Sequence, residues 1–171
     1  MKTIARAIAL TQASLLFAMS AGIDGAWAQA NNPETADPTS FAGATEVRAQ
    51  IQAMLATMKP DQGFMWRALV RDGKTVAAIE IWKKPGRPAV HPAEAEYAIV
   101  LEGSGTLVSG GTMADAKTSN AGLLEGSRIE GGTTRTLGPG DVILIPAGVP
   151  HWFGITGDRL ILLGVKLPGA K

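Results

Sequence analysis

From Gly63 to the end of the chain, short apolar runs alternate with clusters of turn-forming residues. The clusters include Gly110-Gly111, Gly131-Gly132 and Gly157-Asp158. Runs and clusters in this order are typical of short antiparallel strands joined by tight turns. The 21 glycines and 10 prolines among 171 residues agree with this interpretation. The sequence therefore predicts an all-β fold, a sandwich or a barrel, formed by one domain.

The predicted strands follow one another at short spacing, which favours antiparallel pairing. Asp72-Gly73 between the first two runs is typical of a hairpin turn, and we expect another turn at residues 102–105. The predicted strands are Phe64 to Arg71, Thr75 to Lys83, Tyr97 to Leu101, Gly105 to Ser109, Gly122 to Ile129, Thr133 to Leu137, Asp141 to Ile145, His151 to Ile155 and Arg159 to Lys166.

Two of the runs have no polar alternation, Val142 to Ile145 and Leu160 to Val165. A strand without alternation is expected to be buried on both faces, either between two sheets or beneath a helix. The chain contains no cysteine, so its stability depends on the apolar core alone.

One helix is predicted, from Ala44 to Met58, because apolar residues recur there at helical spacing. They are Val47, Ile51, Met54, Leu55 and Met58. We expect this amphipathic helix to cover one face or end of the sheet, and contact with a partner is the alternative.

The N-terminal segment has the pattern of a signal peptide. Lys2 and Arg6 precede an apolar segment, and Ala26-Trp27-Ala28 offers a cleavage site. The pattern predicts a signal peptide at 1–28, a flexible segment at 29–43 and a single domain at 44–171. The protein is then periplasmic or secreted, with no membrane association after cleavage, and a membrane anchor is the alternative.

The charges of the chain are almost balanced. There are 16 lysines and arginines against 15 aspartates and glutamates, a formal net charge of +1. No overall field then attracts the protein to nucleic acid or to an anionic membrane, so we expect no nucleic-acid partner.

The candidate site is formed around the only two histidines, His91 and His151. Two glutamates, Glu94 and Glu96, follow His91 closely. Imidazole and carboxylate together suit Fe, Mn, Ni, Cu or Zn, so the pattern predicts a metal or acid/base site. The alternative is a metal-free pocket in which the histidines only form hydrogen bonds.

The residues around His151 resemble the second motif of the cupin superfamily. Gly140, Pro146, Gly148 and His151 have the spacing of that motif, although Ile155 replaces its final asparagine. The resemblance implies a cupin-type jelly-roll barrel with a ligand pocket at its open end, where the two motifs of the family face each other.

The first cupin motif is only partly present. Glu96 and Gly103 fit its second half, and His91 supplies one of its two histidines. Either Ala89 or Ala93 stands where the other histidine would be. The resemblance implies a divalent metal bound by His91, Glu96 and His151, and Glu94 is the candidate for proton transfer.

The function predicted from this resemblance is action on a small organic molecule by an exported cupin, as an oxygenase, isomerase or lyase. The alternative is a non-catalytic protein that binds a small ligand and has a degenerate metal site. The sequence does not decide whether the protein is an enzyme. A homodimer is compatible with the family.

Other residues could contribute to a ligand pocket. Aromatic side chains could form its apolar walls, although plain core packing is the alternative. They are Trp66, Trp82, Trp152 and Phe153. An inward-pointing arginine could bind a substrate carboxylate, and Arg67, Arg128 and Arg135 are the candidates.

Overall fold

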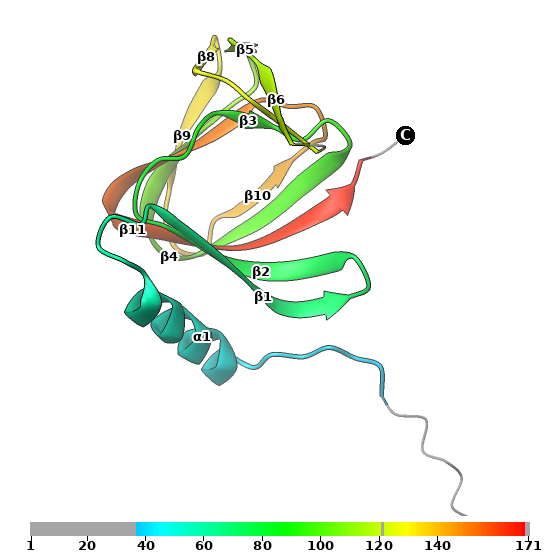
Figure 1. Ribbon diagram of the computed structural model, residues 1–171, viewed down its shortest axis with the longest axis vertical. Helices are drawn as coiled ribbons and strands as arrows, with labels where there is room; N and C mark the ends of the chain where they lie inside the picture. The colour runs from blue at the N-terminus through cyan, green and yellow to red at the C-terminus, as the bar shows by residue number, and fades with distance from the viewer. Residues whose placement is uncertain (1–36, 121, 170–171) are drawn as a thin grey trace, which may run out of the picture. The chain divides into compact units, whose positions relative to one another are not determined.

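The computed structural model describes residues 37–120 and 122–169 (Figure 1). The predicted signal peptide and most of the predicted flexible segment lie outside the described residues, so export and cleavage stay predictions. Within the described part of the chain, no helix is long and apolar enough to cross a membrane.

The described residues form one helix followed by a series of strands. The elements are α1 (Ala44–Thr57), β1 (Phe64–Asp72), β2 (Thr75–Trp82), β3 (Ala89–Val90), β4 (Glu94–Ser109), β5 (Thr112–Ala114), β6 (Lys117–Asn120), β7 (Leu123–Glu125), β8 (Arg128–Glu130), β9 (Thr133–Leu137), β10 (Val142–Ile145) and β11 (His151–Pro168).

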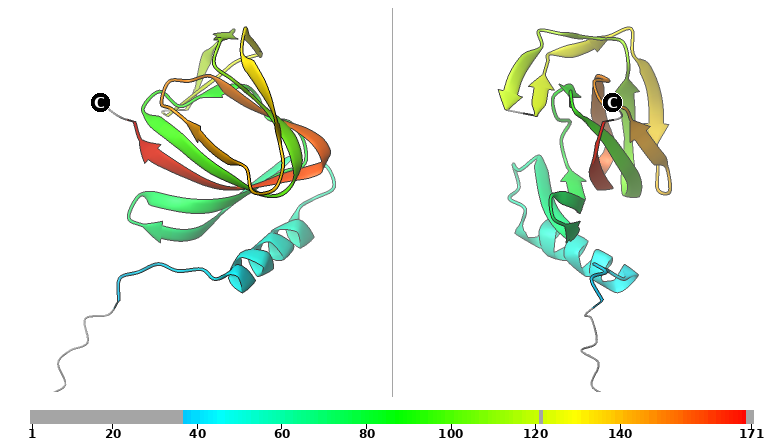
Figure 2. Two further views of the ribbon diagram at one scale, coloured as in Figure 1. Left: turned by 180° about the vertical axis from the view of Figure 1, so that it is seen from behind. Right: turned by 90° about the vertical axis from the view of Figure 1, so that its right-hand side faces the viewer.

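Two long strands, β4 and β11, form the centre of the sheet. They pair with each other along most of their length, and β4 also pairs with β9 and β10. On its other side β11 pairs with β2 and β3, and β2 continues to β1. All these pairs are antiparallel, and the sheet curls around itself in the views of Figure 2. The predicted all-β jelly roll with one helix is confirmed.

The turns predicted at residues 102–105 and 157–158 are wrong, because β4 and β11 each continue through these positions. The glycines there allow the two strands to approach closely at an irregularity in their register. Gly103 has a φ of +82°, and a Cβ on it would lie 2.0 Å from the carbonyl oxygen of Arg159. These glycines therefore mark a bulge within a strand pair.

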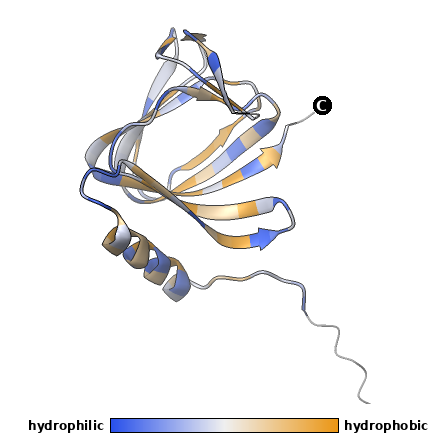
Figure 3. Ribbon diagram, in the orientation of Figure 1, coloured by the Kyte–Doolittle hydropathy of each residue, from blue (hydrophilic) through white to orange (hydrophobic). Residues whose placement is uncertain are grey.

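Helix α1 covers the outer face of β1 and β2, as predicted. Ile51 and Met54 of the helix are buried against Ile79 and Ile81 of β2 and Ile161 of β11. Figure 3 shows β2 mostly orange along its length, because most of its residues are apolar. The helix ends before Pro60, since proline disfavours helical geometry in the residue before it.

The inner face of the same strands forms a second core. Leu160 and Leu162 of β11 point away from the helix and pack on Val100, Ile143 and Phe153. The run at 160–165 is therefore covered on both faces, which confirms the prediction.

The prediction that β10 is buried on both faces is wrong. Ile143 and Ile145 are buried in the inner core, but Val142 is 63% exposed and Leu144 is 62% exposed. Among the described elements, α1 contacts β1 and β2 and none of its packing partners lies on β10. The outer face of β10 is therefore exposed rather than packed beneath the helix.

Candidate metal centre

The segments that carry the two histidines are joined by their backbones. The amide of Gly148 donates a hydrogen bond to the carbonyl oxygen of His91, with an N–O distance of 2.9 Å. Gly148 has a φ of +79°, a conformation that glycine adopts without strain. His151, the first residue of β11, pairs in register with Ala89 of β3. The two imidazole rings consequently lie side by side, with centroids 5.5 Å apart.

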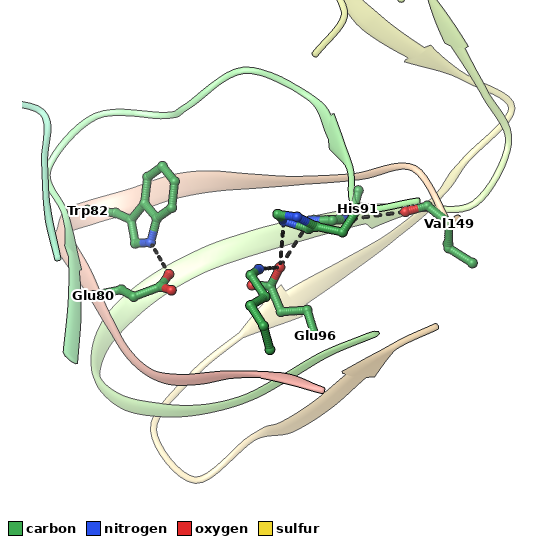
Figure 4. Close-up of polar contacts among 7 residues, drawn as sticks. Glu80, Trp82, His91, Glu96 and Val149 are labelled. Carbon is green, nitrogen blue, oxygen red and sulfur yellow. Dashed lines mark hydrogen bonds and ion pairs between the residues drawn. The ribbon is translucent and has the colours of Figure 1, made fainter. Parts of the chain in front are cut away.

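The structure brings together the three residues predicted as metal ligands (Figure 4). The Oε2 atom of Glu96 lies 3.2 Å from Nε2 of His151 and 3.5 Å from Nε2 of His91. One ligand atom from each residue lies within 4.8 Å of the others. The side chains of Glu96, His151 and His91 are 4%, 5% and 16% exposed, so all three are largely shielded from solvent.

The orientation of His151 is fixed by the backbone. Its Nδ1–H donates a hydrogen bond to the carbonyl oxygen of Val149, at 3.0 Å. A carbonyl can only accept, so Nδ1 carries a proton. In the neutral ring Nε2 then has a free lone pair, whereas in the doubly protonated ring Nε2 donates a hydrogen bond to Oε2 of Glu96. Histidines that bind metals typically have the neutral arrangement, because the bond on the far nitrogen orients the ring.

Lys166 also reaches Glu96. The two residues pair across β4 and β11, and the ammonium group of Lys166 donates a hydrogen bond to Oε2 of Glu96. Lys166 could not be identified from its sequence context, because its position opposite Glu96 depends on the register of two strands far apart in the chain. A fixed positive charge therefore lies beside the candidate metal site.

These contacts change the pKa values of the site. Burial alone would raise the pKa of Glu96, but the hydrogen bond from His151 and the charge of Lys166 outweigh burial and lower it to about 2. Burial and then the charge of Lys166 lower the pKa of His91. Glu96 is therefore ionised and His91 favours its neutral form, and these are the forms that bind metals.

A second buried carboxyl, Glu80 of β2, lies near this site and was not predicted. Its Oε2 accepts a hydrogen bond from the indole N–H of Trp82 at 3.3 Å. Burial, and then the negative charge of Glu96, raise its pKa from 4.5 to about 7. A single charged residue in the apolar run at 76–82 was the only signal in the sequence.

These groups line a cavity of about 410 Å³. It is lined by Phe64, Trp66, Glu80, Trp82, Gly86, Arg87, Ala89, His91, Glu96, Leu123, Glu125, His151, Trp152, Phe153 and Lys166. All four aromatic residues that the sequence analysis singled out are among them. A cavity of this size, with apolar walls and a few polar groups, is typical of sites for small molecules.

Other candidates from the sequence lie elsewhere. Glu94 is exposed at the start of β4 and does not line the cavity. The three candidate arginines are also exposed and absent from its walls. Ala89 lines the cavity whereas Ala93 is exposed, so Ala89 is the residue placed where the missing motif histidine would face the site.

Comparison with known proteins agrees with this structure. Residues 86–166 match the profile of the cupin family. No curated protein matches the chain in sequence.

Solved structures with a related fold include hydroquinone 1,2-dioxygenase from Sphingomonas sp. TTNP3, with 4-hydroxybenzoate bound. It has a TM-score of 0.50 and 15% sequence identity over 68% of this chain and 71% of that chain. The TT1209 protein from Thermus thermophilus has a TM-score of 0.48 and 18% identity over 70% of this chain and 95% of that chain. At 15% identity, the likeness to the dioxygenase concerns the fold alone.

Proposed function

We propose that the protein is a cupin that binds a divalent metal through His91, Glu96 and His151 and acts on a small organic molecule in the adjoining cavity. The proposal is supported by one observation above all. Two imidazole Nε2 atoms converge on the same carboxylate oxygen, and the backbone fixes the ring that lies closest to it.

The short distances agree with a proton or a cation at this point. When its ring is neutral, with the proton on Nδ1, His151 directs a lone pair at Oε2 of Glu96, which is also an acceptor. Two acceptors 3.2 Å apart repel each other unless a proton or a cation lies between them. Two nitrogens and one oxygen suit Fe, Mn, Ni, Cu or Zn and leave further coordination positions for a ligand. When bound, such a metal supplies Lewis-acid or redox chemistry.

The other cavity residues have separate tasks in this proposal. The aromatic side chains exclude water and give the organic ligand an apolar surface. Lys166 keeps Glu96 ionised. Glu80, which titrates near neutral pH, can accept or release a proton at its carboxyl oxygens.

Metal content and thermal stability of the purified protein test the proposal. We expect about one metal ion per chain after reconstitution and a melting temperature that rises with metal, because a ligand of the folded state stabilises it. Less than about 0.1 ion per chain, with no stabilisation by any of the five metals, contradicts the proposal.

A second candidate function is metal-free binding of a small ligand. The ammonium group of Lys166 favours it, because this cation already balances the charge of Glu96. In that case ligand affinity is the same in a chelator and in added metal. In the metal-dependent protein, the chelator weakens binding of any ligand that coordinates the ion.

A further inference from the structure

The aromatic residues of the protein are concentrated in the cavity. Of the seven phenylalanine, tryptophan and tyrosine residues between 37 and 169, five line it. They are Phe64, Trp66, Trp82, Trp152 and Phe153. Trp82 lies between two of the others, with its ring centroid 4.2 Å from that of Phe64 and 6.2 Å from that of Phe153.

The hairpin of β1 and β2 presents a group of these residues together with one carboxyl. Phe64 pairs in register with Trp82, and Trp66 pairs with Glu80. Alternate residues of a strand share a face, so these four side chains lie on the same face of the hairpin. Three aromatic rings therefore share this face with the carboxyl of Glu80.

Folding alone does not explain this face. Met65, which alternates with Phe64 and Trp66, packs in the core beneath helix α1. Phe64 and Trp66 instead remain 40% and 48% exposed at the cavity. Exposed aromatic surface of this kind indicates a binding site, because a ligand that covers it removes apolar area from water.

Glu80 supplies the polar contact on this face. Trp82 already donates to its Oε2. Its Oε1 lies beside Gly164 of β11, where a Cβ would come within 2.8 Å of the oxygen. The glycine therefore leaves the space that this carboxyl group itself occupies, and a larger residue would displace it.

Without a bound metal, the charges of the cavity disfavour an anionic ligand on the aromatic side. Three carboxyls line the cavity, those of Glu80, Glu96 and Glu125. Of the two basic residues, Lys166 is paired with Glu96, and Arg87 is exposed. A hydroxyl group suits Glu80 in either protonation state, because it accepts from the acid and donates to the carboxylate.

We infer that the cavity takes a small uncharged aromatic molecule with a hydroxyl group, a simple phenol, whose ring lies against Phe64 and Trp66 and whose hydroxyl bonds to Glu80. The inference rests on the proposed function only in that the cavity holds an organic ligand. A volume of about 410 Å³ suits a molecule with one ring.

Three matched probes test this inference: 4-methylphenol, toluene, which lacks the hydroxyl, and 4-methylbenzoate, which has a carboxylate in its place. Tryptophan fluorescence reports binding directly, because Trp66, Trp82 and Trp152 all line the cavity. We expect 4-methylphenol to bind about tenfold more tightly than toluene, since one buried hydrogen bond separates the two. We also expect it to bind more tightly than 4-methylbenzoate, whose negative charge is repelled by the carboxylates of the cavity. Equal affinity for toluene, tighter binding of 4-methylbenzoate, or no binding of 4-methylphenol overturns the inference.

Two substitutions of Glu80 refine the test. Glu80→Leu should reduce the affinity for 4-methylphenol to that for toluene, and continued toluene binding shows that the cavity is intact. Glu80→Gln keeps a donor and an acceptor and should stay within about threefold of the unmodified protein. Asp158→Asn, which removes an exposed carboxylate outside the cavity, is the control. Unchanged 4-methylphenol affinity in Glu80→Leu contradicts the assigned role of Glu80.

Metal uptake and binding of 4-methylphenol are measured separately. Titrations of 4-methylphenol in chelator and in metal-reconstituted protein show whether its binding needs the ion. Phenol binding without any metal uptake refutes the proposed metal centre and supports this inference. Metal uptake without phenol binding refutes this inference and leaves the metal centre standing.

Discussion

The two sides of the cavity each bury one carboxyl, and the two carboxyls differ in charge. Glu96 on the histidine side is 3% exposed, and its pKa is lowered to about 2. Glu80 on the aromatic side is 7% exposed, and its pKa is raised to about 7. Burial raises the pKa of both, so the opposite outcomes come from their neighbours.

The neighbours of Glu96 are His151 and Lys166, which stabilise its negative charge. Glu80 accepts a hydrogen bond from the neutral indole of Trp82, and the negative charge of Glu96 repels its own. The histidine side of the cavity is therefore suited to a cation, and the aromatic side to an uncharged polar group. Four predictions, from the largest expected effect to the smallest, test this difference.

The largest effect is expected from His151→Ala, which removes the ligand that the backbone holds in place. We expect metal binding to fall by more than about 100-fold, since even loss of a residue that only orients a ligand costs about 10- to 100-fold. Calorimetric titration of the metal measures the change. His151→Ala protein that still binds one ion per chain with unchanged affinity would show that the ion lies elsewhere.

The second largest effect is expected on how the stability of the folded protein depends on pH. A carboxyl whose pKa is raised on folding stabilises the folded protein below its unfolded value of 4.5, and this contribution is lost as pH rises through about 7. A shift of this size corresponds to about 3 kcal/mol. Glu96 acts in the opposite sense, since its contribution is lost as pH falls from 4.5 to about 2.

Urea unfolding in chelator at several pH values measures these contributions. Relative to Glu80→Gln, the unmodified protein should lose about 2 to 3 kcal/mol between about pH 4 and pH 8. Parallel curves for the two proteins would mean that Glu80 has an ordinary pKa, and the contrast with Glu96 would disappear.

A smaller effect is expected on adding a histidine to the metal side. Ala89 lines the cavity opposite His151 in the strand pair, so Ala89→His offers a third imidazole. We expect metal affinity to rise about tenfold, measured by competition with a coloured chelator. Ala93→His is the matched control, because Ala93 is exposed. If only Ala93→His binds metal more tightly, the assignment of the two positions is reversed.

The smallest effect is expected for Glu94→Gln. This side chain, the candidate for proton transfer in the sequence, is exposed and outside the cavity. Metal affinity and 4-methylphenol affinity should both change less than about twofold, as for most exposed substitutions. A tenfold loss of either affinity would show that Glu94 belongs to the functional site.

The histidine side could be predicted from the sequence because its residues lie in two short motifs. The spacing from His91 to Glu96 and from Pro146 to His151 is local, so it is visible without the fold. Glu80 and Lys166 could not be predicted in this way. Their positions depend on how β2, β4 and β11 pair, and a slip of one residue would direct either side chain to the opposite face.

The two wholly apolar runs show the same limit for the fold. Both have the composition of doubly buried strands, but only β11 has helix packing on its outer face. The exposure of Val142 and Leu144 depends on where α1 lies, and the residues of β10 do not encode it. The sequence likewise does not show that β4 and β11 continue through their glycines, because a bulge and a turn use the same residues.

The hydrogen bond between Gly148 and the carbonyl of His91 joins main chain to main chain. Side-chain replacement nearby does not remove either partner, provided that the turn keeps its glycine. The geometry of the cavity is thus separable from the chemistry of the residues that line it. Such a scaffold can exchange its ligating side chains without refolding, which makes it suited to acquiring new reactions.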